Sequence, residues 1–309
     1  TAVFARVPDL RSIVVIDEHD DSLREERTPT WHARDIAIER AQQANVSCLL
    51  VSALPSVAAK VWANGRVVKS DEHETQSEWP SIQLIDRTLD ERWSNSLLSS
   101  DFIAELRDHA RRIVVVFNTK GRARLLACAS CKSLARCASC DAAVEIGAEG
   151  QFSCPRCSVE RPQVCMKCSS AKFLTLKPGV SKLREEIAQA AGRKVSDVVE
   201  VTGSGDDAVA IDQSKMLFVG TEAALHRVHE ADTVVFLDID QELAAPRYRA
   251  SEIVGSLLVH AARLVGRSDR GGKVMVQTHS IDSPVLQAMA TLRIDQYLQS
   301  VSEMRSFMK

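Results

Sequence analysis

The sequence has no long hydrophobic run and no excess of charge of one sign. Its 309 residues carry 39 lysines and arginines against 41 acidic residues, a net charge of −2. No apolar run approaches the roughly 18 residues that span a bilayer, and no signal-peptide pattern opens the chain. The composition therefore argues against a membrane protein and against a polycation that coats nucleic acid without selection. We expect a cytoplasmic protein.

The hydrophobic content of 45% with 26% charged residues excludes a wholly disordered chain, and the length is enough for two or three domains. Short apolar runs without alternation predict strands that are covered on both faces. These runs are residues 12–17, 48–53, 113–118, 216–220, 233–240 and 273–279. Segments with helical spacing are residues 32–45, 101–112, 181–191 and a terminal helix from Pro284 onward. The alternation predicts layered α/β domains built on parallel sheets.

Eight of the nine cysteines lie between Cys128 and Cys168, where the α/β alternation stops, from about residue 121 to residue 175. They form four CxxC pairs, a spacing that lets both sulfurs of a tight turn reach one ion. The pairs are Cys128/Cys131, Cys137/Cys140, Cys154/Cys157 and Cys165/Cys168. Eight thiolates predict two closed tetrahedral Zn²⁺ sites; an iron–sulfur cluster and redox dithiols are the alternatives. The isolated Cys48 is expected to be a small buried core residue.

The pairing of the cysteines can be argued from topology. Thirteen residues separate Cys140 from Cys154 and include a turn-containing hairpin, which favours a zinc ribbon made by the two inner pairs. The inner site would hold Cys137, Cys140, Cys154 and Cys157, and the outer site Cys128, Cys131, Cys165 and Cys168. Sequential pairing, first with second and third with fourth, is the alternative. Because the α/β alternation resumes after Leu176, we expect this module to be inserted in an α/β domain.

With a two-zinc module inside an α/β lobe, the chain resembles the PriA family of bacterial replication-restart DNA helicases. The resemblance covers nearly the whole chain. Its most specific part is the cysteine array, with five, thirteen and seven residues between successive CxxC pairs. Other matching stretches are WHARD at 31–35, SALPS at 52–56, VGT at 219–221, LDID at 237–240, YRASE at 248–252 and VQTH at 276–279. The resemblance implies two RecA-like helicase lobes, and it also implies the nested cysteine pairing.

The resemblance implies a division of the chain into five segments. Residues 1–75 would be the C-terminal part of helicase lobe 1, 76–120 a linker and the start of lobe 2, and 121–175 the zinc-binding module. Residues 176–295 would complete lobe 2, and 296–309 would start a C-terminal domain. Since the first half of lobe 1 and the family's N-terminal DNA-binding domains would then lie upstream, we expect the chain to be part of something longer.

The nucleotide motifs depart from the family pattern. Helicases of this kind need a P-loop and Mg²⁺-holding carboxylates, and no GxxxxGK[ST] occurs in these residues. The family's DEEH reads IDEHD, its SAT reads Ser52-Ala53-Leu54, and the first arginine of GRAGR is Leu264. The nucleotide-site candidates that remain are Asp17, Glu18 and Arg267. We therefore expect a helicase-like scaffold without catalytic residues, with two Zn²⁺ ions as cofactors and with binding of ATP and Mg²⁺ left open.

The family's aromatic DNA-sensing loop retains only Trp31 here, and Trp31 and Arg34 are the candidate DNA contacts. A packed core tryptophan and a solvated helix arginine are the alternatives. The resemblance implies forked DNA and single-strand/double-strand junctions, primosome proteins and single-stranded DNA-binding protein as partners, and no membrane. The leading hypothesis is a replication-restart protein that recognises stalled or abandoned forks and helps to reload the replicative helicase. An active ATP-dependent 3′–5′ helicase and a general zinc-ribbon adaptor are the alternatives.

Overall fold

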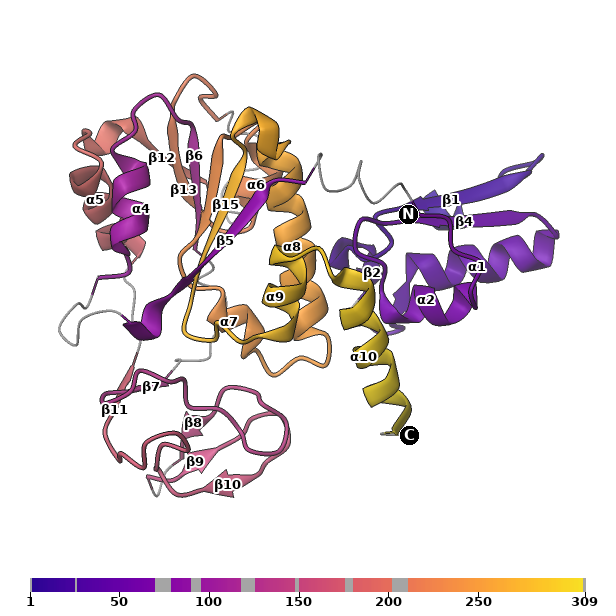
Figure 1. The fold of residues 1–309 in the computed structure, drawn as a ribbon. Helices are drawn as coiled ribbons and strands as arrows, with labels where there is room; N and C mark the ends of the chain where they lie inside the picture. The colour runs from indigo at the N-terminus through magenta and orange to yellow at the C-terminus, as the bar shows by residue number, and fades with distance from the viewer. Residues whose placement is uncertain are drawn as a thin grey trace. The chain divides into compact units, whose positions relative to one another are not determined.

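A computed structural model describes residues 2–25, 27–69, 79–89, 96–117, 126–147, 150–175, 180–201 and 211–307. The chain forms two compact units (Figure 1). The first unit is Thr1–Ser70 with Arg293–Lys309, and the second unit is Asp71–Leu292. The five segments expected from the sequence have other bounds and stay predictions, and the start of the expected linker, residues 76–78, lies outside the described residues.

The first unit is built on two parallel strands, β1 (Ser12–Ile16) and β4 (Ser47–Val51). Helix α1 (Ala33–Ala44) starts where the Nδ1 of His32 accepts the N–H of Arg34 at 3.2 Å, so this histidine has a structural role as the N-cap of the helix. The other elements are β2 (Arg24–Glu25), β3 (Trp31–His32), α2 (Val57–Ala63), α10 (Ile294–Phe307) and the 3₁₀ turns η1 (Ala2–Phe4) and η2 (Asp21–Leu23). Asp295 ties α10 to this unit through an ion pair with Lys60 at 3.0 Å.

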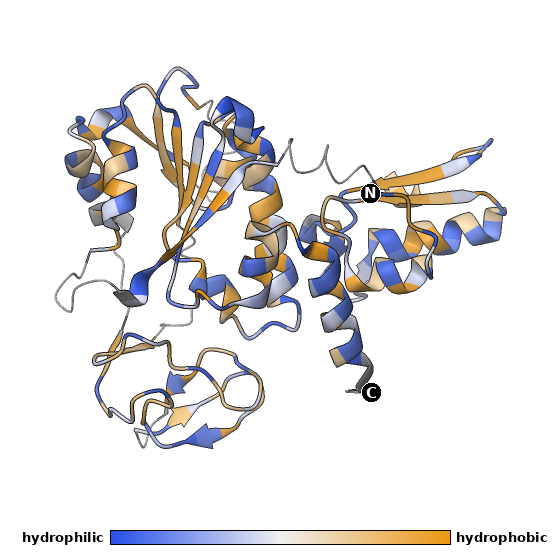
Figure 2. Cartoon of the chain, viewed as in Figure 1, coloured by the Kyte–Doolittle hydropathy of each residue, from blue (hydrophilic) through white to orange (hydrophobic). Residues whose placement is uncertain are grey.

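One face of the β1–β4 pair is apolar and exposed. Val14 lies opposite Leu49 and Ile16 opposite Val51, and these four side chains are 43–69% exposed. Figure 2 shows the apolar colour along β1. Helix α1 covers the opposite face of the pair, which carries the residues that alternate with these four along each strand. The prediction that both faces of these strands are covered is therefore wrong within the described chain.

The second unit contains a six-stranded sheet in which every neighbouring pair is parallel. Its strand order is β12 (Val198–Val201), β13 (Leu217–Gly220), β6 (Ile113–Val116), β14 (Thr233–Phe236), β15 (Lys273–Thr278) and β5 (Ser81–Asp86). Helices α4 (Ser100–Leu106) and α5 (Val180–Ala190) cover one face, and α6 (Ala223–Arg227), α8 (Ala250–Val265) and α9 (Pro284–Ala290) cover the other (Figure 1). The expected α/β architecture is confirmed. The 3₁₀ turns are η3 (Arg87–Leu89), η4 (Val195–Asp197) and η5 (Ser268–Arg270).

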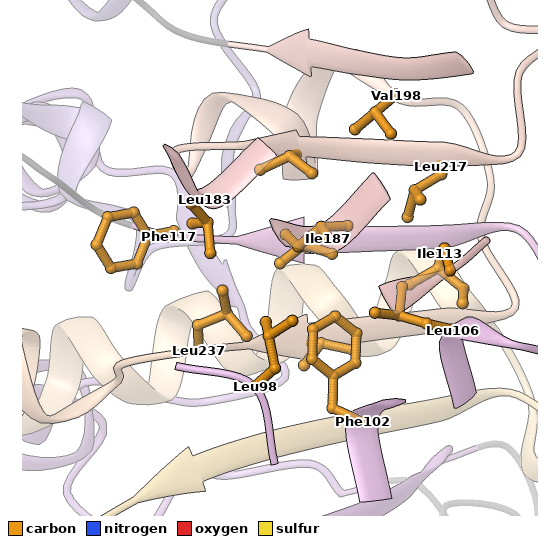
Figure 3. Close-up of a cluster of buried hydrophobic side chains, with 14 of the residues drawn as sticks. Leu98, Phe102, Leu106, Ile113, Phe117, Leu183, Ile187, Val198, Leu217 and Leu237 are labelled. Atoms are coloured by element: carbon orange, nitrogen blue, oxygen red, sulfur yellow. The ribbon is translucent and has the colours of Figure 1, made fainter. Parts of the chain in front are cut away.

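Figure 3 shows the core between α4, α5 and the sheet. Phe102 and Leu106 of α4 and Ile187 of α5 are fully or almost fully buried. Burial of each such side chain contributes about 1.5–3 kcal/mol. At the end of β13, a Cβ on Gly220 would lie 1.8 Å from the carbonyl oxygen of Val201, which explains the glycine of the VGT stretch.

The cysteine module (residues 126–175) lies between β6 and α5 in the sequence. Strands β7 (Leu126–Cys128) and β11 (Phe173–Thr175) pair antiparallel where the chain enters and leaves it. The expected hairpin is formed by β8 (Glu145–Ile146) and β9 (Phe152–Ser153), and β10 (Glu160–Arg161) adds a third strand. The module's apolar core is small and centres on Phe152, whose ring meets Phe173 edge to face at 4.8 Å.

Three expectations about elements are wrong. The edge strands β5 and β12 were not predicted as strands. The single terminal helix from Pro284 is two helices, α9 and α10, separated at Leu292, whose φ is 57°.

Among the helices of the described ranges, none is long and apolar enough to cross a bilayer.

Candidate metal centre

The eight sulfur atoms of the cysteine module lie in two groups of four. The inner group is Cys137, Cys140, Cys154 and Cys157, and the outer group is Cys128, Cys131, Cys165 and Cys168. Within each group the four sulfurs lie within 4.8 Å of one another. The structure thus brings the cysteines together in the nested arrangement and not in sequential pairs.

Each CxxC turn, here called a knuckle, has the same backbone geometry. The N–H of the residue after the second cysteine donates to the carbonyl of the first cysteine at 2.9–3.0 Å. That residue has a φ of 58° in all four knuckles: Lys132, Asp141, Ser158 and Ser169. The N–H of each first cysteine in turn bonds the carbonyl two residues after the second cysteine at 2.8–3.0 Å. The CxxC spacing therefore folds into four copies of one turn that aims two sulfurs at one point.

The sulfur geometry fits a tetrahedral ion. A metal with bonds of about 2.3 Å to four sulfurs separates them by about 3.8 Å. The sulfur of Cys137 lies 3.5 Å from that of Cys157, and the sulfur of Cys131 lies 3.6 Å from that of Cys165. These distances exceed the roughly 2.05 Å of a disulfide, and all nine cysteines are free. Cys48 is half-buried, where a fully buried core residue was expected.

Hydrogen bonds lower the pKa of Cys137 in the inner group and of Cys131 and Cys165 in the outer group. Burial raises the pKa of the Cys165 thiol, but hydrogen bonds from Ser133 and from the backbone N–H of Cys168 outweigh burial and bring the pKa to about 6. In the inner group, burial is likewise outweighed by the backbone N–H of Ser139 and Cys140, which bring the pKa of Cys137 to about 7. Deprotonated sulfur is the form that binds Zn²⁺. The donor set of both groups therefore suits Zn²⁺.

The motif residues of the first unit meet in a buried polar cluster. Glu18 is 1% exposed and its Oε2 lies 3.1 Å from Nη1 of Arg34. Ser56 donates its N–H and its hydroxyl to the same carboxylate at 2.6 and 2.8 Å. Next to them, Nδ1 of His19 lies 2.6 Å from the hydroxyl of Ser52. The IDEHD, WHARD and SALPS stretches are thus close together because these residues bond one another.

The remaining nucleotide and DNA candidates have different surroundings. Asp17 has a left-handed backbone with φ 54°, at the end of β1. Arg267 lies in the second unit, in the turn before β15, and pairs with Asp269 at 3.0 Å. Trp31 is half-buried and meets Phe4 edge to face at 5.1 Å. Arg34 is 5% exposed, and its guanidinium is directed at Glu18 and Ser56.

The carboxyl end of the second unit's sheet holds polar residues whose roles the sequence did not predict. Asp240 starts the short helix α7 (Asp240–Leu243) and is 1% exposed. Its carboxylate accepts from the hydroxyl of Thr278 at 2.8 Å and from the N–H of His279 at 2.7 Å. The LDID and VQTH stretches therefore bond each other across β14 and β15. The signal in the sequence was their position directly after two buried parallel strands.

Asp238 lies beside this cluster, and its carboxyl group accepts from Nε2 of Gln241 at 2.6 Å. Although part of the residue's surface is exposed, the carboxyl group itself is enclosed. Burial, with the negative charge of Asp240, raises the pKa of Asp238 to about 7. This edge therefore holds a carboxyl group that titrates near neutral pH.

No protein-family model matches the chain. Proteins named Replication restart protein PriA are similar to it along nearly its whole length. The protein of Haemophilus influenzae is 26% identical over 100% of this chain, that of Bacillus subtilis 24% over 97%, and that of Chlamydia pneumoniae 27% over 93%. The chain covers 40–44% of the length of these three relatives. This similarity, together with the two nested cysteine groups inside a parallel α/β lobe, supports a protein of the PriA family.

Proposed function

We propose that the chain acts in replication restart, as a PriA-type protein that recognises stalled or abandoned forks, binds their DNA junctions and helps to reload the replicative helicase. The observation that carries the proposal is the similarity along 93–100% of the chain to proteins named for replication restart. Primosome proteins and single-stranded DNA-binding protein are the partners that the family resemblance implies. The chain's slight net negative charge fits selective rather than general binding of DNA.

We propose that both cysteine groups hold Zn²⁺ as structural ions. When bound, each ion would cross-link two knuckles that are distant in the sequence. Four sulfur ligands leave no open coordination position, so the ions would hold the module in shape and would not bind a reacting group. The small apolar core around Phe152 supports this role, because a module with so few buried side chains needs such a cross-link.

Loss of ATP hydrolysis is part of the proposal. The carboxylate of Glu18 already accepts three hydrogen bonds from Arg34 and Ser56. Leu264 stands where the family has an arginine, and removal of an arginine finger lowers the rate of phosphoryl transfer by about 10³–10⁵-fold. We therefore expect the protein to bind forks without unwinding them.

The second candidate is an active ATP-dependent 3′–5′ DNA helicase with divergent motifs. It is favoured by the retention of Arg267 on a partly exposed turn and of Asp17 and Glu18 at the end of β1. An ATPase assay with forked DNA separates the two candidates. We expect no DNA-stimulated turnover; turnover of about one per second or more that disappears in Arg267→Ala would favour the helicase.

The most suitable DNA contact in the first unit is Trp31. Arg34 is buried against Glu18, whereas Trp31 keeps part of its ring exposed beside Phe4, which is 56% exposed. A partly exposed aromatic pair can stack on an unpaired base, with a contribution of about 1–3 kcal/mol. Trp31→Ala should therefore weaken binding to forks that carry a single-stranded arm. Trp62→Ala, on α2 of the same unit, is the matched control.

A competition assay tests the proposed function. The full-length protein should bind a forked substrate more tightly than duplex of equal length, and its affinity should fall with salt as phosphate contacts require. Trp31→Ala should reduce the preference for the fork, and Trp62→Ala should keep it. Equal affinity for fork and duplex would contradict the proposal and favour the general zinc-ribbon adaptor.

A further inference from the structure

Two contacts fasten the inner cysteine group to the carboxyl end of the sheet. Arg136 precedes Cys137, and its Nη2 donates to the hydroxyl of Ser280 at 2.8 Å. The N–H of Ala143, three residues after Cys140, donates to the carbonyl of Ala244 at 2.8 Å. Arg136 and Ala143 also face each other in an antiparallel bridge. The two contacts therefore come from the residues that flank one knuckle, Cys137–Cys140, one on each side.

The knuckle orients the arginine. Nη1 of Arg136 pairs with the carboxylate of Asp141 at 2.7 Å, and Asp141 is the residue with positive φ directly after Cys140. The carbonyl of Arg136 accepts from Nη2 of Arg161 at 3.0 Å. Asp141 is part of the cysteine turn, because its N–H bonds the carbonyl of Cys137 at 3.0 Å. The guanidinium that reaches Ser280 is therefore held by a residue of that turn.

On the sheet side, both contacts lead to Asp240. Ala244 is bonded to it directly, through its N–H and the carbonyl of Asp240 at 2.8 Å. Ser280 donates its N–H to the hydroxyl of Thr278 at 2.9 Å, and that hydroxyl donates to the Asp240 carboxylate. Asp240 is thus the point at which the ends of β14 and β15 and the two contacts from the module meet.

An apolar contact accompanies these polar ones. Ala143 and Ala244 are buried against each other, with Leu134 of the module packed beside them. Their burial keeps water from the Ala143–Ala244 hydrogen bond, and a shielded hydrogen bond is held more firmly than an exposed one. The docking of the module on the sheet edge is therefore a packed interface.

The knuckles of the outer group bond within the module. The N–H of Ala129 donates to the carbonyl of Lys172 at 2.8 Å, and the hydroxyls of Ser130 and Ser170 lie 3.0 Å apart. These bonds join the first knuckle to the last. The two cysteine groups therefore have different neighbours, although their sulfur geometry is the same.

We propose that a metal ion at the inner cysteine group positions the carboxyl end of the sheet, residues 240–244 and 278–280, through Arg136 and Ala143. The proposal rests on metal binding by the inner group. Loss of that ion opens the knuckle, releases the two contacts and loosens Asp240 and its partners, whereas loss of the outer ion leaves this edge in place. The inner ion then has an effect outside the module, and the outer ion only closes the module.

Cys157→Ser and Cys168→Ser are a matched pair of variants, because each removes the exposed member of its group. Zinc content and amide hydrogen exchange would be measured on both variants. Each should lose one Zn²⁺ of two. Cys157→Ser should speed the exchange of amides in 240–244 and 278–281 by about fivefold or more, and Cys168→Ser should leave it unchanged. Equal effects of the two variants, or no change at this edge in Cys157→Ser, would overturn the proposal. A wild-type content below two ions would contradict the zinc assignment, and the absence of an ion from the inner group would overturn the positioning as well.

If Cys157→Ser does not fold, Arg136→Ala, Ser280→Ala and the double variant provide the test with both ions in place. Each single variant should speed exchange in 278–281, and the double variant should add little, because both single changes remove the same contact. Unchanged exchange in both single variants, or fully additive effects, would overturn the proposal.

Discussion

The residue after each knuckle has a positive φ, although none of the four is glycine. A side chain in this left-handed region costs roughly 1–2 kcal/mol, and glycine avoids that cost. Ser158 is exposed and has a φ of 58°. Ser158→Gly should therefore stabilise the folded module by up to about 1 kcal/mol, measured as slower amide exchange in 152–161. Ser153→Gly, in the extended strand β9, should destabilise it; a stabilising effect of similar size there would contradict the explanation.

Asp238 should make the free energy of unfolding depend on pH, and the direction of its pKa shift gives the sign of that dependence. Its raised pKa, about 7, means that the folded protein holds a proton that the unfolded chain has already released at pH 6. Stability from this group is therefore lost as the pH rises, and linkage over pH 6 to 8 gives a decrease of about 1.4 kcal/mol in the free energy of unfolding. Asp238→Asn should remove this part of the pH dependence in urea titrations. If wild type and variant change equally between pH 6 and 8, the carboxyl group is not protonated in the folded state.

The elements of the first unit are held together by the buried ion pair of Glu18 and Arg34. Glu18 follows β1, Arg34 is in α1, and Ser56 precedes α2, so one carboxylate joins three elements. Glu18→Ala removes the buried carboxylate from the Arg34 guanidinium and leaves it only the more exposed Asp35 as an acidic partner, which costs up to about 3–5 kcal/mol. The opening free energy of α1 and β4, measured by amide exchange, should fall by that amount. Asp21→Ala, which loses an exposed pair with Arg24, should change it by less than about 0.5 kcal/mol.

A small effect of Glu18→Ala would instead mean that the carboxylate is available for another ligand. Such a result would make Glu18 a candidate nucleotide-site residue again.

Sequence patterns predicted the inner strands better than the edge strands. All residues of β6, β13 and β14 are buried, and their continuous apolar runs gave a clear signal. The edge strands β5 and β12 carry polar residues on their less covered sides, so no continuous apolar run marked them. The break at Leu292 was also missed, because the apolar spacing runs through it and neither glycine nor proline marks the end of α9.

The candidate metal site was predictable because the CxxC spacing itself fixes the local turn. The nested grouping followed from the hairpin between Cys140 and Cys154. The contacts of Arg136 with Ser280 and of Asp240 with Thr278 were not predictable, since they join residues 144 and 38 positions apart in the sequence. Such contacts depend on the order of strands in the sheet, and the sequence pattern does not determine that order.

At the scale of the whole molecule, the proposed role of the cysteine groups in holding the module in shape depends on two bound ions, one in each group, and the proposed positioning of the sheet edge depends on the inner ion. Zinc content tests this most directly. Elemental analysis of the purified chain should give two Zn²⁺ per chain and no iron, and about one Zn²⁺ in Cys157→Ser and in Cys168→Ser. A wild-type content of one zinc, or iron with visible absorbance, would contradict it.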